Sequence, residues 1–363
     1  MQTHASSGAR ERPGFDGLDC RPWAELGAAD WEAWQSIVDA NPELQSPFFS
    51  AAFARIVGRS SDDVWVGRLW AHGEIVGFFP FHRRRFGVAH PLGRGLSDHH
   101  GVIAGARLKL EPRELLRRCR LRAFEFHHLL AAQTSFCPYA SAHAGSPIVD
   151  LGAGFAEYRR RVDGRSSIWS KVEAARRRLE RAAGPVRVEL DCRERRLLEL
   201  MRSLKSAQYH RTGGRDIFTD AWTRQILQRV FESREPTCAG LLSVLWAGDR
   251  PVALHLGMRS RAVLHYWFPT YDPTFARHSP GSILLADLAR ASSDLGVRVV
   301  DLGKGDSAYK ARFSNGAIPL LEGRVELSSA MAIWRRVRGL VARLARQHEF
   351  RVDEWPTGRA VTR

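Results

Sequence analysis

The sequence predicts an α/β protein made of two copies of one unit, each a mixed, twisted sheet flanked by helices. Residues 69–81 (LWAHGEIVGFFPF) and residues 245–257 (LWAGDRPVALHLG) follow the same layout. In both, an apolar strand ends in Leu-Trp-Ala, turns at a glycine and an acidic residue, and returns as a second apolar strand. One such similarity can be a coincidence, because any hairpin needs a turn. Helices are also expected before both hairpins, and this shared order favours two copies of one α/β unit.

Length and composition are those of a folded protein. The chain has 363 residues and 44% hydrophobic content, which excludes a disordered composition and allows about two to three domains. It contains no apolar run of about 18 residues, and its N-terminus lacks the apolar core of a signal peptide. We therefore expect a soluble, cytoplasmic protein.

We predict four segments along the chain. Residues 1–18 are expected to be disordered, residues 19–155 to form a degenerate first unit, and residues 156–327 to form a second unit that carries the active site. Residues 328–363 are expected to form a basic amphipathic helix and a tail. The stripe of Trp334, Val337, Val341 and Leu344 among arginines either packs on the domain or places residues 328–346 on an anionic membrane surface.

The charge balance favours anionic partners. Lysine and arginine number 55 against 39 acidic residues, which gives a net charge of +16, and very few of the 55 are lysines. Such a surplus suits phosphorylated cofactors, nucleic acid or acidic membranes, although codon bias toward arginine explains it equally well. The five cysteines are scattered and never at CxxC spacing, so we expect neither a disulfide framework nor a zinc ribbon.

Hydrophobic spacing predicts the elements of the first unit. The expected helices cover residues 28–40, 50–57 and 111–120, the last of them opened by Pro112. The expected strands cover residues 63–69, 75–82, 123–129 and 146–151.

The second unit follows the same reasoning. The expected helices cover residues 167–183, 194–208 and 220–232, with a further helix from Pro280, and the expected strands cover residues 186–190, 241–246, 263–268 and 297–302. The helix over residues 167–183 has one apolar stripe and a face rich in arginine. That face is either solvated or lies along a phosphate-rich ligand.

A candidate anion site lies where the helix from Pro280 begins between two strands. The free N–H groups and the dipole of a helix N-terminus attract an anionic group. Arg277 and His278 add positive charge just before it, although a plain helix cap also explains the Ser-Pro-Gly start. The predicted cofactor-binding residues are Arg277, His278, Ser279, Gly281 and Ser282.

A second candidate region is the turn after the strand that ends near Asp301. This turn lies at the carboxyl edge of the sheet, where α/β proteins place ligands. Lys310 and Asp306 form either part of a site or an ordinary surface ion pair. Two lysines in one turn are unusual for this chain, and the polar residues of the turn are Asp301, Lys304, Asp306, Tyr309 and Lys310.

Histidines and aromatic residues complete the candidate site. His255 and His265 lie within apolar strands, where each is a catalytic candidate or a packed core residue. Asp98, followed by His99 and His100, either reaches the site, if the two units face each other, or belongs to an ordinary polar turn. We predict no metal, because the adjacent histidines lack a third ligand at suitable spacing. The aromatic residues Tyr266, Trp267, Phe268 and Tyr271 are expected either to line the acceptor channel or to pack in the core.

Several of these motifs resemble one known family. The segments AGDRPVALHLG, LHYWFPTYDPTFARHSPGSILL and RVVDLGKGDSAYKARF resemble the GNAT-superfamily acetyltransferases of the CelD/BcsL (BioF-like acetyltransferase domain) family. GRGLSDHHGVIA and RSSIWSKVEAARRRLE are also similar to that family, so the resemblance covers roughly residues 45–325. These are tandem GNAT proteins related to the Fem aminoacyl transferases.

The resemblance implies acyl transfer from a thioester in a wedge between two splayed parallel strands. By resemblance to the Fem relatives, Lys310 stabilises the negative charge that develops in the reaction. The resulting catalytic set is Lys310, His255, Asp301 and Asp306, and the substrate-binding set is Asp98, His265, Tyr266, Tyr271, Lys304 and Tyr309.

Three function classes remain open. The first is an acetyl or other acyl transferase that uses acyl-CoA and acts on an amine or hydroxyl of a sugar or polysaccharide precursor in envelope biosynthesis. The second is a Fem-like transferase that takes an aminoacyl group from tRNA, which would suit the net charge of +16. The third is a binding module that keeps the fold without catalysis.

Overall fold

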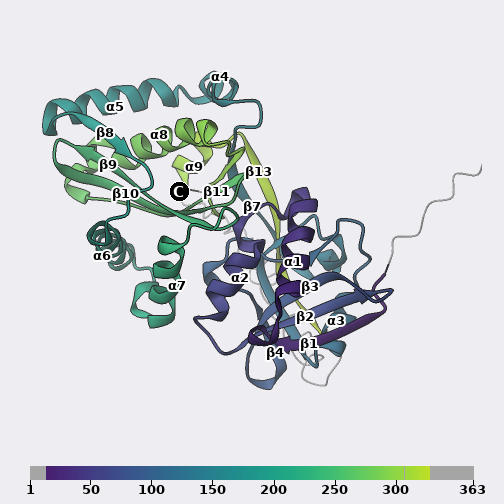
Figure 1. Ribbon diagram of the computed structural model, residues 1–363. Helices are drawn as coiled ribbons and strands as arrows, with labels where there is room; N and C mark the ends of the chain where they lie inside the picture. Colours follow the sequence, from purple (N-terminus) through teal and green to yellow (C-terminus); the bar gives the residue numbers. More distant parts are fainter. Residues whose placement is uncertain (1–13, 306, 328–363) are drawn as a thin grey trace, which may run out of the picture. The chain divides into compact units, whose positions relative to one another are not determined.

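The computed structural model describes residues 14–305 and 307–327 (Figure 1). The chain forms a compact unit that ends at Val325, and the residues from Glu326 on belong to a second unit. Asp306 and the predicted basic helix over residues 328–346 lie outside the described residues. No helix in the described part of the chain is long and apolar enough to cross a membrane.

The elements predicted for the first half of the sequence are all present, together with three further strands. Its helices are α1 (Ala28–Ala40), α2 (Ala51–Gly58) and α3 (Pro112–Arg118). Its strands are β1 (Gly17–Pro22), β2 (Val64–Ala71), β3 (Glu74–Arg83), β4 (Val88–Pro91), β5 (Ile103–Ala104), β6 (Ala123–Leu130) and β7 (Ala140–Asp150).

The second half repeats this pattern of strands with covering helices. Its helices are α4 (Phe155–Ser166), α5 (Ile168–Ala183), α6 (Arg195–Thr212), α7 (Ala221–Glu232), α8 (Pro280–Asp294) and α9 (Ala308–Phe313). Its strands are β8 (Val186–Glu189), β9 (Ala239–Ala247), β10 (Arg250–Arg259), β11 (Val263–Tyr271), β12 (Val299–Asp301) and β13 (Gly316–Glu326).

The strand order supports the repeat. Strands β1 to β4 form an antiparallel series, and β4 then pairs in parallel with β6. Strands β8 to β11 likewise form an antiparallel series, and β11 pairs in parallel with β12. The two predicted hairpins are confirmed as β2–β3 and β9–β10. The fold is therefore the predicted α/β type with two similar halves.

The two halves exchange their last strands. Strand β7, from the first half, pairs with β12 and β13, and β13, from the second half, lies between β6 and β7. The described strands therefore join into one 13-stranded sheet. This join was not predicted, because single-sequence patterns indicate strands without naming their partners.

Helices cover both faces of the second half of the sheet. Figure 1 shows α5 and α8 on one face of β8 to β11, and α6 and α7 on the other. The alternation of side chains along β9 explains this arrangement. Leu241 and Leu245 belong to the buried cluster that includes α5 and α8, whereas Leu242 and Val244 belong to the cluster that includes α6 and α7.

Some element boundaries differ from the prediction. The stretch expected to be disordered reached residue 18, but Gly17–Pro22 form β1, which pairs with β2. The sequence GLDCRP contains only two alternating apolar residues, Leu18 and Cys20, which is too short a pattern to predict a strand without its partner β2. Strand β11 extends to Tyr271 rather than residue 268, and β12 is shorter than residues 297–302.

Strands β11 and β12 separate after a short parallel pairing. The paired positions are Val263 with Val299, Leu264 with Val300, and His265 with Asp301. Beyond His265, β11 continues to Tyr271 without a strand on that edge in the described part of the chain. On its other edge, the register with β10 shifts because one residue of β10, Gly257, lies opposite two residues of β11. Such a bulge bends a strand and increases its twist.

Gly257 is expected to be required at this bulge. A Cβ at this position would lie 2.4 Å from His255 Cε1 and 2.8 Å from the backbone oxygen of His265. Gly257→Ala should therefore lower the free energy of unfolding by about 1–3 kcal/mol in urea titrations, because neighbouring groups must move. The matched control is Gly145→Ala in β7, whose added Cβ would meet Ala317 at an ordinary 3.6 Å. Equal stability of the two variants would contradict this prediction.

Candidate active site

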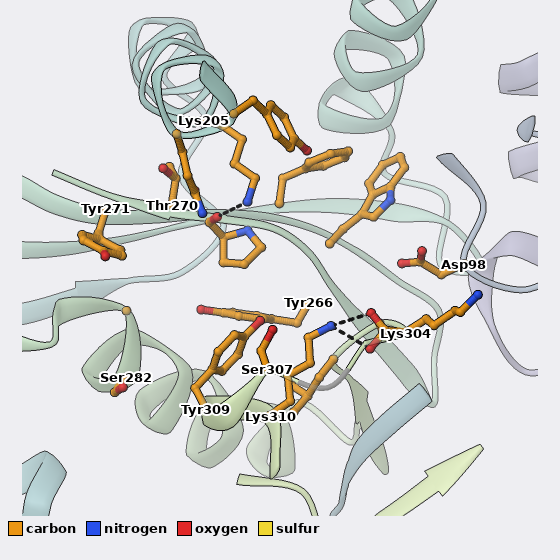
Figure 2. A pocket seen from close by; sticks show the side chains of 18 of the residues that line it. Asp98, Lys205, Tyr266, Thr270, Tyr271, Ser282, Lys304, Ser307, Tyr309 and Lys310 are labelled. Carbon is orange, nitrogen blue, oxygen red and sulfur yellow. Dashed lines mark hydrogen bonds between the residues drawn. The ribbon is translucent and has the colours of Figure 1, made fainter. Parts of the chain in front are cut away.

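A cavity of about 650 Å³ opens where β11 and β12 separate. Its walls come from β11, the first residues of α8, the turn after β12, α6, α9 and the loop after β4. Figure 2 shows side chains from these elements around the opening. The structure brings nine of the predicted site residues to this cavity, namely Asp98, Tyr266, Tyr271, Ser279, Gly281, Ser282, Lys304, Tyr309 and Lys310.

The turn after β12 positions Lys310. Gly303 and Gly305 have φ values of +73° and +122°, which residues other than glycine rarely adopt. The turn directs the carbonyl oxygens of Gly303 and Lys304 at the ammonium of Lys310, which donates hydrogen bonds to them at 2.8 and 2.9 Å. Lys310 is buried in α9, so its charge is held at one place in the wall of the cavity.

Lys205 is a cavity residue that the sequence did not indicate. It comes from α6 and donates a hydrogen bond to the carbonyl oxygen of Pro269 at 2.9 Å. Figure 2 shows it entering from the side opposite to Lys310. Burial and, to a lesser extent, the positive charge of Lys310 lower the pKa of Lys205 to about 8.

Lysine is concentrated at this cavity. The chain has only five lysines, and three of them, Lys205, Lys304 and Lys310, line it. Lys304 forms an ion pair with Glu322 and lies 3.4 Å from the carbonyl oxygen of His127. The rarity of lysine in this arginine-rich chain could therefore have marked Lys205 as a candidate site residue. The sequence alone does not distinguish it from Lys109 and Lys171, because only the fold places Lys205 at the cavity.

Asp98 brings a carboxylate from the first half of the chain. A Cβ built on Gly303 would lie 3.4 Å from Asp98 Oδ2 and 3.8 Å from Lys310 Nζ, so the two charged groups converge on this glycine. Burial and, to a lesser extent, the nearby charge of Asp301 raise the pKa of Asp98 to about 7, against the opposing effects of His99 and Lys310. The prediction that Asp98 reaches the second half of the chain is consistent with this geometry.

Tyrosines form the remaining wall near Lys310. Tyr266 is buried on β11, and this burial, together with the nearby Tyr309, raises its pKa well above the ordinary tyrosine value. Burial raises the pKa of Tyr309 to about 12, so its hydroxyl remains protonated at neutral pH. Behind Tyr266, the ring of His255 stacks on it with centroids 4.3 Å apart.

The start of α8 faces the cavity through Pro280, Gly281 and Ser282. Ser279 occupies the N-cap position with φ of +51°, and its hydroxyl caps none of the described backbone N–H groups. The expected serine cap is therefore absent from the described structure. Arg277 and His278 lie outside the lining of the cavity, where the Nε of Arg277 contacts His278 Nε2 at 3.0 Å.

Three predicted residues lie behind the cavity wall. His255, His265 and Asp301 are fully buried and do not line the cavity. Burial lowers the pKa of both histidines to about 3, so neither ring is charged at neutral pH. The interior position argues against direct contact of His255 or His265 with a substrate. The remaining catalytic candidate, Asp306, lies outside the described residues.

Lys205 should make the stability of the folded protein depend on pH. Its pKa is about 8 in the folded protein, below the ordinary lysine value of 10.5, so the unfolded chain binds more protons between these values. The wild type should gain stability relative to Lys205→Met as pH rises from about 8 to about 10.5. At about pH 7 the variant should be more stable by roughly 1–3 kcal/mol, because methionine buries no charge.

Urea unfolding across this pH range measures the difference. The control is Lys171→Met, because Lys171 is an exposed residue of α5. A stability difference between wild type and Lys205→Met that is independent of pH would contradict the lowered pKa.

Comparisons with known proteins agree with the geometry of the second half. Residues 166–311 match the family described as an acetyltransferase (GNAT) domain. The crystal structure of FemX aligns with a TM-score of 0.57 and 10% identity over 85% of this chain and 98% of that chain. A search of curated proteins found no match.

Two further solved structures align with lower scores. One is a tandem GNAT protein from the clavulanic acid biosynthesis pathway, with a TM-score of 0.49 and 10% identity over 86% of this chain and 100% of that chain. The other is the C-terminal DUF2156 domain of a protein from Agrobacterium fabrum assigned as a lysylphosphatidylglycerol synthetase, with a TM-score of 0.49 and 12% identity over 87% and 97% of the two chains. FemX shows the fold, and the family match shows that the chain carries a GNAT-type acetyltransferase domain over residues 166–311.

Proposed function

We propose that the protein transfers an acyl group, most simply acetyl, from acyl-CoA to an amine or hydroxyl of a sugar or polysaccharide precursor. The observation that carries this proposal is the cavity at the separation of β11 and β12, with Lys205 and Lys310 on opposite sides. A slot along an unpaired strand edge suits an extended thioester arm, because its amides can bond the free backbone groups of the strand. The proposed assignment to the CelD/BcsL family rests on the quoted sequence motifs.

The donor would enter with its phosphates near the start of α8. Gly281 and Ser282 line the cavity there, and the N-terminal end of a helix favours a negative group. Arg277 is exposed just before this helix and supplies additional positive charge in the same region. The thioester carbonyl would then lie farther along β11, toward Tyr266 and Lys310.

Lys310 is proposed to stabilise the oxyanion. Attack of the acceptor nitrogen or oxygen on the thioester carbon places negative charge on the carbonyl oxygen. The Lys310 ammonium is already held by two carbonyl oxygens, so little reorganisation is needed when this charge appears. When the C–S bond breaks, its electron pair and the proton lost by the acceptor end on the CoA thiol.

The acceptor is proposed to bind at the Asp98 side of the cavity. Asp98 can accept a hydrogen bond from an N–H or O–H group, and its carboxylate converges with Lys310 on Gly303. Trp267, whose ring N–H donates to the carbonyl oxygen of Leu96, also lines the cavity on this side and offers aromatic surface to a sugar ring. Tyr271 lies instead beside Gly281, at the start of α8 (Figure 2). This arrangement supports a polyhydroxylated or amino-sugar acceptor.

A second candidate is transfer of an aminoacyl group from tRNA. The FemX likeness and the net charge of +16 favour it, because phosphate contacts provide much of the affinity for nucleic acid. Thermal-shift titrations with acetyl-CoA and filter binding with total tRNA distinguish the donors. Stabilisation by acetyl-CoA without tRNA retention supports the first candidate, and the reverse result supports the second.

Lys310→Met tests the proposed chemistry. Thiol release from acetyl-CoA in the presence of a panel of amino sugars should fall by about 100- to 1000-fold in kcat, because one oxyanion-stabilising group is lost. The KM for acetyl-CoA should change much less, since Lys310 acts mainly in the transition state.

Lys171→Met, which changes an exposed lysine of α5, is the matched control and should retain full activity. Full turnover by Lys310→Met would remove the proposed role of this residue. Absence of acetyl-CoA binding and of tRNA binding would instead favour a non-catalytic module.

A further inference from the structure

A group of buried side chains behind the cavity is not used by the proposed reaction. His265 on β11, Asp301 on β12 and His99 from the loop after β4 are each at most 3% exposed. One ring nitrogen of each histidine and one oxygen of Asp301 lie within 4.8 Å of one another. The group therefore joins three segments that are far apart in the sequence.

The atoms that face one another lack hydrogen bonds. His99 Nε2, His265 Nδ1 and Asp301 Oδ2 are buried, and none makes a hydrogen bond of acceptable geometry to a described residue. His99 Nε2 lies at ion-pair distance from Asp301 Oδ2, 3.0 Å, and His265 Nδ1 lies 3.9 Å from Asp301 Oδ1, so these groups face one another around the carboxylate. Leaving several polar atoms unsatisfied at one buried point is costly, so their convergence requires an explanation.

The outer atoms of the same residues are held in place. Ser46 Oγ lies 2.8 Å from His265 Nε2 in hydrogen-bonding geometry. Asp301 Oδ1 accepts hydrogen bonds from the hydroxyl of Ser146 and, at 2.8 Å, from the backbone N–H of Gly303. These partners orient the histidine and the carboxylate as second-layer residues do around bound metals.

We propose that His99, His265 and Asp301 bind a Zn²⁺ ion. Two imidazole nitrogens and one carboxylate oxygen are a ligand set that zinc accepts, and the cation would compensate the buried carboxylate. In a tetrahedral site, bonds of about 2.0 Å place the ligand atoms about 3.3 Å from one another. Movements of about 1 Å or less by these side chains would therefore bring all three atoms into coordination.

A second cavity offers access and a fourth ligand. It has a volume of about 290 Å³, and Ser46 and His99 line it together with the acidic residues Glu43 and Asp150. Water in this space can complete a tetrahedral site, and the carboxylates favour entry of a cation.

The ion would hold β11 and β12 together at the point where they begin to separate. His265 and Asp301 are the last paired positions before β11 and β12 separate. Leu302 and Gly303, which follow Asp301, already line the cavity. Zinc at this point would join both strands and the first half of the chain, which makes its role structural.

The neighbouring histidine group does not share these properties. His100, His127 and His128 also lie close together. However, His100 Nε2 contacts the carbonyl oxygen of Ser97 at 2.9 Å, and its Nδ1 accepts a hydrogen bond from the backbone N–H of His128 at 3.3 Å. Both ring nitrogens of His100 are therefore already used.

Metal analysis of the full-length protein tests the zinc site. Protein purified without chelators should contain about one zinc per chain by mass spectrometry. Removal of zinc with a strong chelator should lower Tm, and addition of one equivalent of ZnCl₂ should restore it. Asp301→Asn should lose the bound zinc, and reconstitution of the wild type with Co²⁺ should give visible absorption typical of tetrahedral coordination.

Ser46→Ala provides a milder test if Asp301→Asn does not fold. Loss of the partner of His265 should weaken zinc binding by about 10- to 100-fold. Ser243→Ala, which changes a buried serine of β9, should leave zinc affinity unchanged. Wild-type protein without bound zinc and without a Tm response to ZnCl₂ overturns the proposal, as does full zinc occupancy in a folded Asp301→Asn variant.

Discussion

The short parallel pairing of β11 and β12 is the constraint on which the rest of the site depends. It ends at His265 and Asp301, and β11 then continues alone along the cavity. Because backbone groups at an unpaired edge need partners, this separation produces a slot that favours an extended ligand. The bulge of β11 opposite Gly257 lies on its other edge at the same level, so the bulge and the opening belong to one distortion of the sheet.

Charge at the opening comes from both halves of the sequence. Lys310 and Lys205 belong to the second half, whereas Asp98 belongs to the loop after β4 in the first half. The first half therefore supplies a wall and a carboxylate to a site whose strands lie in the second half. This division explains why a family match over residues 166–311 alone does not contain the whole cavity.

Local patterns in the sequence were sufficient for most elements. Helix α1 and both hairpins follow from apolar spacing and turn residues, and the turn that holds Lys310 follows from its glycines and lysines. Residues whose role depends on distant partners were harder to place. Lys205 lies in an ordinary amphipathic helix, β1 depends on β2, and His99 meets His265 and Asp301 only in the folded sheet. The interior position of His255 likewise argues against direct contact with a substrate, and strand alternation alone does not tell which face opens to a ligand.

The exchange of β7 and β13 has a consequence for the order of folding during synthesis. Strand β7 leaves the ribosome long before its two neighbours, β12 and β13, have been translated. The central part of the sheet can close only when nearly the whole described chain is available, so the first half emerges with an unpaired strand. Its eleven residues, Ala140–Asp150, carry proline, histidine and glycine in place of a continuous apolar run, a composition that limits pairing between nascent chains.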